Sequence, residues 1–418
     1  MTHAAAPIAI YKAIEDVLQK DQGRLMAGLV SRLGDFQLAE DALQDALISA
    51  MSHWGRSGLP HAPTGWLMKV AYNRGIDRIR KGQSETRKSQ DFGMVHPSWT
   101  NVPDEDPIPD ERLRLIFACC HPILGEKSRV ALTLRTVCNL TTREIAAAFL
   151  DNDVAIGQRI SRAKTTFKNA GIGFEIPEPD AWPTRLNTVL SAVYLIYTVS
   201  YVNEDRSDRD LGGEALFLLR LLNKLCPDDP EIEGALALVL LTEARREARV
   251  GADGASVPPE IQDRQLWNTP MIEEGRALLN TAMERRCPGP YQIKAAIADC
   301  HMSGPTPDWQ QISLLYGALW PYEPTPVVAL NWATVMAELG EIELALKKIE
   351  TLETDLRTFQ PYFAAYADVL VKTGRIHDAK EAYRTAANMA QNESSKRFLE
   401  NALAKLEIEN PIDPAVPF

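Results

Sequence analysis

The chain of 418 residues has few cysteines and no long apolar run. Its six cysteines show no even spacing, which favours reduced thiols over a disulfide framework. The most apolar stretch, Val189 to Val202, is too short to span a bilayer and is flanked by polar residues. The first residues lack the basic start and apolar core of a secretory signal. We therefore expect a cytoplasmic protein without a membrane segment.

The sequence also lacks the short motifs of common enzyme sites. It contains no phosphate-binding glycine loop, nucleophile elbow or metal-protease helix. The run Cys119 to His121 has no second ligand pair at a fitting distance, so core thiols are favoured over a zinc site. We therefore predict neither enzyme activity nor a cofactor or metal.

Alternating β-branched runs are missing, and apolar residues recur at helical spacing along almost the whole chain. This pattern predicts an all-α fold. Within residues 8–90 we expect three or four helices, one near Ile8 and the others at Arg24 to Leu33, Phe36 to Trp54 and Thr64 to Arg80. The predicted segments that follow are an acidic, proline-rich linker at 91–111, helices at 112–172, a second linker at 173–185 and a large helical domain at 186–405.

A repeat is visible near the end of the chain. Gly340 and Gly374 are 34 residues apart, and so are Ala345 and Ala379. Each glycine separates two amphipathic segments, and this period with a turn glycine is typical of tetratricopeptide repeats. We predict such repeats near residues 312–403, either as a protein-binding array or as a scaffold without a separate ligand. Further upstream, the run EARREAR at 243–249 is either a salt-bridged helix face or a dock for an acidic surface.

The net charge of -11 is unevenly distributed. Residues 1–172 hold 22 basic and 19 acidic residues, whereas the remainder holds 23 against 37. Seven bases and two acids occur between Trp66 and Gln90, and six acids without a base follow between Asp91 and Glu111. Charge in such blocks indicates a surface that faces a polyanion, with acidic segments kept apart from it.

The segment AIGQRISRAKTTFKNA at 155–170 carries only positive charge. On a helical wheel its apolar residues Ile156, Ile160, Ala163 and Phe167 fall within about 60° of one another. The remaining faces carry amide, hydroxyl and cationic groups, which suit base edges and phosphates. These residues are Gln158, Arg159, Ser161, Arg162, Lys164, Thr165 and Lys168. A solvated basic face is the alternative interpretation.

A second helix precedes this segment. In TTREIAAAFL, Thr141 and Glu144 have the spacing of a capping box. A short turn then leads into the basic helix, so the pair has the helix-turn-helix pattern.

The segment TGWLMKVAYNRGIDRIRKG forms a second basic element. Leu67, Val70, Ala71 and Ile79 are placed toward a core, and basic residues remain outward. Basic charge beside aromatic rings suits unstacked bases, but Trp66 and Tyr72 could equally be core residues. The outward residues are Lys69, Asn73, Arg74, Arg78 and Arg80.

Taken together, these segments resemble a known family. AEDALQDALISAMSHW, GWLMKVAYNRGIDRIRK, TLRTVCNLTTREIAAAFL and GQRISRAKTTFK are similar, in order and spacing, to regions 2.1 to 2.4 and 4.1 to 4.2 of extracytoplasmic-function (ECF) sigma factors of bacterial RNA polymerase. Further on, RLRLIFACCHPIL, LALVLLTEARREARV, IQDRQLWN and GPYQIKAAIADCH resemble the subgroup with a fused helical, tetratricopeptide-containing domain.

The resemblance implies partners and site residues. Core RNA polymerase would bind the helix from Phe36 to Trp54, and promoter DNA would bind the next helix at the minus-ten element and the basic 155–170 segment at the minus-thirty-five element. The polymerase-binding residues implied are Glu40, Asp41, Gln44 and Asp45. The minus-ten residues implied are Trp66, Lys69, Asn73, Arg74, Asp77 and Arg78. The outward residues of the 155–170 segment already named would read the minus-thirty-five element.

The resemblance also bears on regulation and on the linker. The carboxy-terminal domain would regulate the sigma regions by an intramolecular contact, whose sign stays open. The linker would imitate nucleic-acid charge or act as a plain tether, and its acids are Asp104, Glu105, Asp106, Asp110 and Glu111. Ala155 stands where the family commonly has a capping Thr, so Asp153 is the expected cap. The rival functions are a dimeric helix-turn-helix regulator with a protein- or ligand-sensing solenoid, and a tetratricopeptide scaffold.

Overall fold

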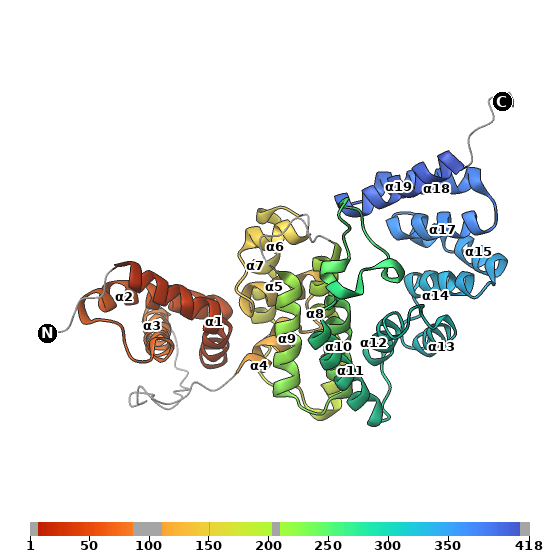
Figure 1. Cartoon of the computed structure of the whole chain (residues 1–418). Helices are drawn as coiled ribbons and strands as arrows, with labels where there is room; N and C mark the ends of the chain where they lie inside the picture. Colours follow the sequence, from red (N-terminus) through yellow and green to blue (C-terminus); the bar gives the residue numbers. More distant parts are fainter. Residues whose placement is uncertain (1–6, 87–110, 150, 203–209, 410–418) are drawn as a thin grey trace. The chain divides into compact units, whose positions relative to one another are not determined.

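The computed structural model describes residues 7–86, 111–149, 151–202 and 210–409 (Figure 1). These residues are mainly helical, and they contain no β-strand beyond one isolated bridge between Val250 and Ser256. The all-α prediction is confirmed. The chain divides into two compact units, residues 1–199 with 206–210 and residues 200–205 with 211–418.

The first unit begins with three helices that pack on one another, α1 (Pro7–Leu33), α2 (Phe36–Ser57) and α3 (Pro63–Thr86). A row of fully buried alanines along α2 lets its backbone lie close to both neighbours. We predicted a break before Arg24, and this was wrong, because α1 runs without interruption through Gly23. Burial of apolar residues just after that glycine, Leu25 and Leu29 among them, offsets its helix cost of about 1 kcal/mol.

Four further helices of the first unit are α4 (Arg112–Cys119), α5 (Glu126–Thr136), α6 (Thr142–Phe149) and α7 (Asp153–Asn169). Cys119 and Cys120, at the end of α4, are fully buried, so the prediction of core thiols is confirmed. Burial raises the pKa of Cys120 to about 11, although its sulfur lies 3.4 Å from the Thr133 hydroxyl. The thiol therefore stays protonated at neutral pH.

The segment that we predicted as a second linker packs against the first unit. A short 3₁₀ helix (Pro179–Ala181) leads into α8 (Trp182–Val202). The Trp182 ring lies 5.1 Å from the Phe117 ring, and the Arg185 guanidinium donates to the Phe117 carbonyl at 2.7 Å. The first compact unit accordingly extends through most of α8.

The second unit contains the remaining helices, and α10 (Pro230–Glu243) is buried nearly all round between α9, α11 and α12. Three 3₁₀ turns connect α10 to α11, and in this connection Arg246 and Arg249 both pair with Glu243. The other helices are α9 (Leu211–Leu225), α11 (Thr269–Glu284), α12 (Pro290–Cys300), α13 (Trp309–Leu319), α14 (Pro326–Glu338), α15 (Ile342–Glu350), α16 (Glu353–Leu356), α17 (Gln360–Lys372), α18 (Ile376–Met389) and α19 (Glu393–Glu409).

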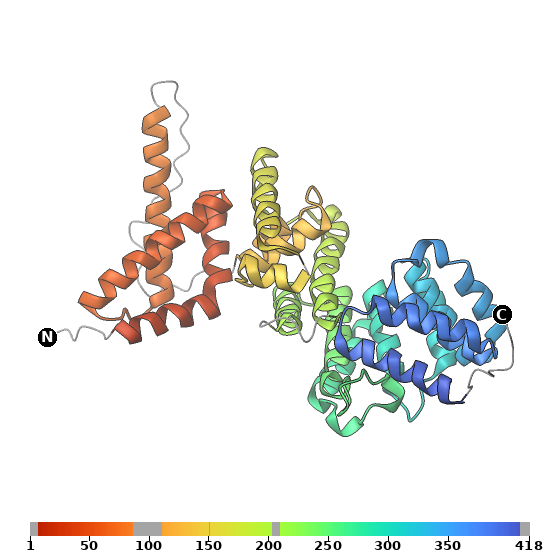
Figure 2. The ribbon, with the colours of Figure 1, turned by 90° about the horizontal axis from the view of Figure 1, so that it is seen from above.

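The 34-residue period corresponds to two helix pairs, α14 with α15 and α17 with α18. Gly340 and Gly374 begin the turn inside each pair with φ of 88° and 78°, a backbone conformation that favours glycine. Ala345 and Ala379, at the matching places on the second helices, are fully buried. From above, α18 and α19 lie side by side at the blue end of the chain (Figure 2). In the part of the chain that the structure covers, no helix is both long and apolar enough to cross a bilayer.

Candidate nucleic-acid interface

The helix α6 begins with the predicted capping box. The Thr141 backbone N–H donates to the Glu144 carboxylate at 2.7 Å, and the Glu144 N–H donates to the Thr141 hydroxyl oxygen at 3.2 Å. Each side chain thus satisfies a backbone group that the helix leaves unpaired, which confirms the capping-box prediction.

The cap of α7 differs from our prediction. The Asn152 side chain accepts a hydrogen bond from the Ala155 N–H at 2.7 Å, whereas Asp153 is already the first helical residue. Asp153 as the cap was wrong, because a capping oxygen must come from the extended residue before the helix, and Asn152 has that backbone. Arg159 also holds Asp151 at 3.0 Å, so the turn is fastened to α7.

The apolar stripe of α7 is as predicted. Ile156, Ile160, Ala163 and Phe167 are all buried. The predicted base-reading residues on the opposite face are exposed, and their mutual hydrogen bonds are local, such as that from Thr165 to the Ser161 carbonyl. These exposed residues are Gln158, Ser161, Arg162 and Thr165.

The two lysines on the flank of α7 meet acids at the start of α2. The Lys164 Nζ lies 2.6 Å from the Glu40 Oε2, with only 11% and 21% of the two side chains exposed. The Lys168 Nζ lies 2.6 Å from the Asp35 Oδ2. Beside these ion pairs the Phe36 ring lies 5.4 Å from the Phe167 ring, and a cavity of about 220 Å³ remains at this junction.

Asp35 has two roles at this junction. Besides pairing with Lys168, it caps α2 by accepting from the Gln37 and Leu38 N–H groups at 2.8 and 3.1 Å. Burial alone would raise the pKa of Asp35, but the Lys168 ammonium and the two backbone donors outweigh it and hold that pKa below its usual value. The carboxylate therefore stays charged down to low pH and keeps both contacts.

The other predicted polymerase-binding acids of α2 form ion pairs with α3, the predicted minus-ten helix. The Arg78 guanidinium lies 2.8 Å from the Asp41 carboxylate and 2.7 Å from that of Asp45. Gln44 is exposed. The structure thus brings residues from all three predicted site groups together around α2.

The other predicted minus-ten residues lie on the outer face of α3. Lys69, Asn73, Arg74 and Asp77 are exposed. Trp66 is half-buried, with its ring 5.4 Å from that of the buried Trp54 and 5.5 Å from His53, on which it stacks. His53 was missed from the sequence. It lies thirteen residues upstream of Trp66 on another helix, and no local pattern links the two.

Of the linker acids, Asp104, Glu105, Asp106 and Asp110 lie outside the described residues. Glu111 precedes α4 and pairs with Arg114 at 3.1 Å. In the described ranges, no three His, Cys, Asp or Glu side chains gather to hold a metal ion.

Comparison with known proteins places this geometry in context. The model of sigma-70 region 2 matches residues 17–85, and the model of a family of unknown function, DUF6596, matches residues 185–283. The uncharacterized protein R00370 of Rhizobium meliloti is 37% identical over 407 residues, which cover 95% of this chain and 96% of R00370. The chain belongs to the R00370 family.

Shorter matches describe the amino-terminal part of this R00370-family chain. It is 28% identical over 149 residues to the ECF RNA polymerase sigma factor SigK of Mycobacterium sp. strain KMS, covering 34% of this chain and 75% of SigK. The SigK of Mycolicibacterium vanbaalenii is 28% identical over 141 residues, or 32% of this chain and 69% of that protein. The first third of the chain is thus that of an ECF-like sigma factor. None of the solved structures matches the chain significantly.

Proposed function

We propose that this chain is a promoter-specificity subunit, which binds core RNA polymerase and directs it to a cognate promoter without catalysing a reaction. The observation that carries the proposal is the capped helix pair α6–α7, whose second helix exposes a polar face. The exposed residues are Gln158, Ser161, Arg162 and Thr165. The pair follows, in the sequence, a segment that matches sigma-70 region 2. Amide and guanidinium groups on one exposed helix face can distinguish base edges in a major groove.

In this proposal α7, α3 and α2 each bind a different partner. In the proposal α7 enters the major groove at the minus-thirty-five element, and the outer face of α3 binds the minus-ten element. The acids of α2 face the polymerase, where charge complementarity would speed association. Glu40 already pairs with Lys164, so a polymerase cation that binds this acid would compete with that ion pair.

The test is transcription in vitro from a mapped promoter with purified core enzyme. Arg162→Ala removes an exposed base-reading group and should cost about 1 to 3 kcal/mol, or roughly 5- to 150-fold in promoter affinity. Arg384→Ala removes another exposed arginine, which pairs with Glu407 on α19, and serves as the control for lost charge. Equal output from both variants would refute base reading by α7.

The rival regulator makes a different prediction. A dimeric helix-turn-helix repressor would bind duplex DNA as a dimer and would not co-purify with core polymerase subunits. Co-purification of those subunits with the full chain supports the sigma function, and its absence at low salt counts against that function.

We further propose that the carboxy-terminal helices regulate the sigma regions. The supporting observation is that α8 belongs mainly to the first unit, while its last residues belong to the second, so the units share one helix. A chain ending at residue 210 would keep the first unit whole. If its transcription equals that of the full chain, the regulatory proposal is wrong.

A further inference from the structure

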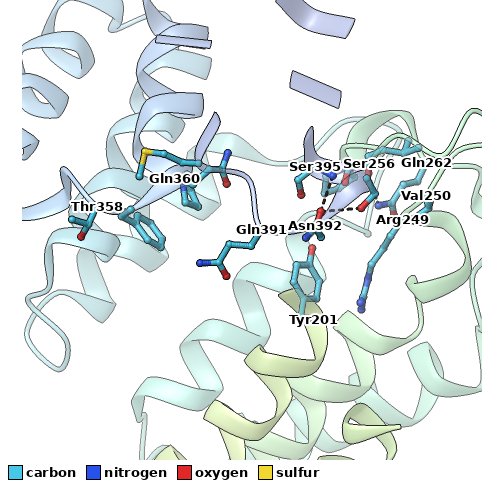
Figure 3. Close-up of a pocket in the computed structure, with 16 residues that line it drawn as sticks. Tyr201, Arg249, Val250, Ser256, Gln262, Thr358, Gln360, Gln391, Asn392 and Ser395 are labelled. Atoms are coloured by element: carbon cyan, nitrogen blue, oxygen red, sulfur yellow. Dashed lines mark hydrogen bonds between the residues drawn. The ribbon is translucent and has the colours of Figure 1, made fainter. Parts of the chain in front are cut away.

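The second unit contains a pocket of about 420 Å³ (Figure 3). Its walls are the end of α8, the connection from Arg249 to Gln262 and the starts of α17 and α19. Arg249 is the one charged residue among the described residues that line it. The Arg249 guanidinium already lies 3.5 Å from the Glu243 carboxylate, which Arg246 shares. The lining therefore selects no class of ligand, in contrast to an aromatic surface of the first unit.

Three aromatic rings contact one another in series where α2 packs on α3. The Trp54 ring is fully buried, and the Trp66 ring lies 5.4 Å from it at an angle of 63°. The His53 ring lies 5.5 Å from the Trp66 ring and is only 18° from parallel with it. Trp66 is half-buried and His53 is exposed. The row is thus anchored in the core at Trp54, and the outer face of the His53 ring meets solvent.

Cations flank the exposed end of this row. Arg56 on α2 and Lys69 on α3, both exposed, each follow one of the two outer rings by about one helical turn. The stretch 46–76, which supplies all three rings, contains no Asp or Glu. Asp21 of α1 meets the start of α3, where it accepts from the Thr64 hydroxyl at 2.9 Å. The surface around His53 therefore combines an exposed ring with positive charge, the combination that binds unpaired nucleic-acid strands.

We propose that His53 and Trp66 form a stacking platform for an unpaired base of the separated promoter strand. The platform presupposes the proposed sigma function, and it adds His53 to the residues predicted for the minus-ten element. A base on the outer face of His53 continues the row of rings, and Arg56 and Lys69 contact the phosphates beside that base. Every base has a flat face, so the platform holds the open strand without reading its sequence.

The test measures how tightly the holoenzyme, reconstituted from the full chain and core polymerase, binds a labelled single-stranded oligonucleotide of the mapped minus-ten element. His53→Leu still covers Trp66 but offers no flat ring. It should lower the affinity about 5- to 150-fold, the range for one lost stack. His53→Phe keeps a ring and should bind like the wild type. His377→Ala removes an exposed histidine of α18 and is the control.

Oligonucleotides that lack one base at a time locate the stacked position. At that position, the loss of the base should weaken binding by the wild type and by His53→Phe. It should not weaken binding by His53→Leu any further, because the stack is already absent there. If His53→Leu fails to fold, His53→Ala takes its place in both comparisons.

Three outcomes would overturn the platform. The first is equal affinity of His53→Leu and His53→Phe, since His53 would then act only by covering Trp66. The second is a wild-type affinity that no single base removal changes. The third is a wild-type chain that binds core polymerase but leaves the oligonucleotide unbound. Failure of the sigma function itself is distinguishable from all three, because the wild-type chain would then not bind core polymerase.

Discussion

A single methyl group added at Gly23 should weaken the packing of α1 on α5. The glycine lies in the interior of α1, directly against the carbonyl of Val137, which ends α5. A Cβ at residue 23 would lie 2.5 Å from the Val137 oxygen and 3.4 Å from its carbonyl carbon. The clashing atoms belong to the Val137 backbone, so they cannot move away by a rotamer change as a flexible side chain could.

The size of the effect follows from two opposing contributions. Carbon contacts are favourable from about 3.5 Å, so the two backbones must separate by roughly 1 Å. Overpacking of this kind costs about 1 to 3 kcal/mol, or roughly 5- to 150-fold in the stability of the contact. Within α1 itself, alanine favours the helix by about 1 kcal/mol over glycine. Gly23→Ala should therefore stabilise α1 and destabilise its contact with α5.

Hydrogen-exchange mass spectrometry on the full chain can separate these two effects. We expect slower exchange across α1 and faster exchange around Val137, where the Cys138 and Leu140 N–H groups bond back into α5. Gly157→Ala is the matched control, because nothing lies within 4 Å of a Cβ at that position on α7. Wild-type protection around Val137 in the Gly23→Ala chain would refute the close packing of α1 on α5.

Further predictions concern α7 and the second unit. Asn152→Ala removes the α7 cap and should destabilise that helix by about 1 kcal/mol, whereas Asp153→Ala should change amide exchange in α7 much less; the reverse order would restore Asp153 as the cap. If Lys168 contacts a phosphate, Lys168→Ala should reduce the slope of log promoter affinity against log salt by about 0.9, whereas exposed Lys405→Ala should not; equal slopes would exclude the contact. Burial and a nearby arginine lower the pKa of His301 from 6.5 to about 4. Because the pKa of His301 is lower in the folded than in the unfolded chain, protons bind the unfolded chain more tightly. The folded state therefore has its full stability above pH 6.5 and loses about 3 kcal/mol in total as the pH falls towards 4. Urea unfolding across that range should show the loss in the wild type and not in His301→Asn.

Local patterns made much of the fold predictable. The spacing of Ile156, Ile160 and Phe167 gave the buried face of α7, and Thr141 with Glu144 gave the start of α6, because both signals depend on neighbours within a few turns. The error at the α7 cap was also local. Asn152 was present in the sequence, and its position three residues before Ala155 is the signal that would have found it.

Tertiary pairings could not be predicted in the same way. Glu40 and Lys164 are 124 residues apart, and nothing in either segment indicates the other. The unbroken α1 was missed for a related reason, since Gly23 would weaken a helix in isolation and only the packing of α1 accounts for it. The pocket was likewise beyond sequence reasoning, because its walls come from residues between Tyr201 and Ser395.

In the proposed function, Asp35 and the acids of α2 would compete with DNA phosphate for the same cations. They hold Lys164, Lys168 and Arg78, three cations that would otherwise face the backbone of promoter DNA in the proposed function. A polymerase surface whose cations pair with these acids would release Lys164, Lys168 and Arg78 in the same step. Polymerase binding and DNA binding would then strengthen each other by equal amounts, since such coupling is reciprocal. The free chain would thus be kept from sequestering promoters before it meets the enzyme.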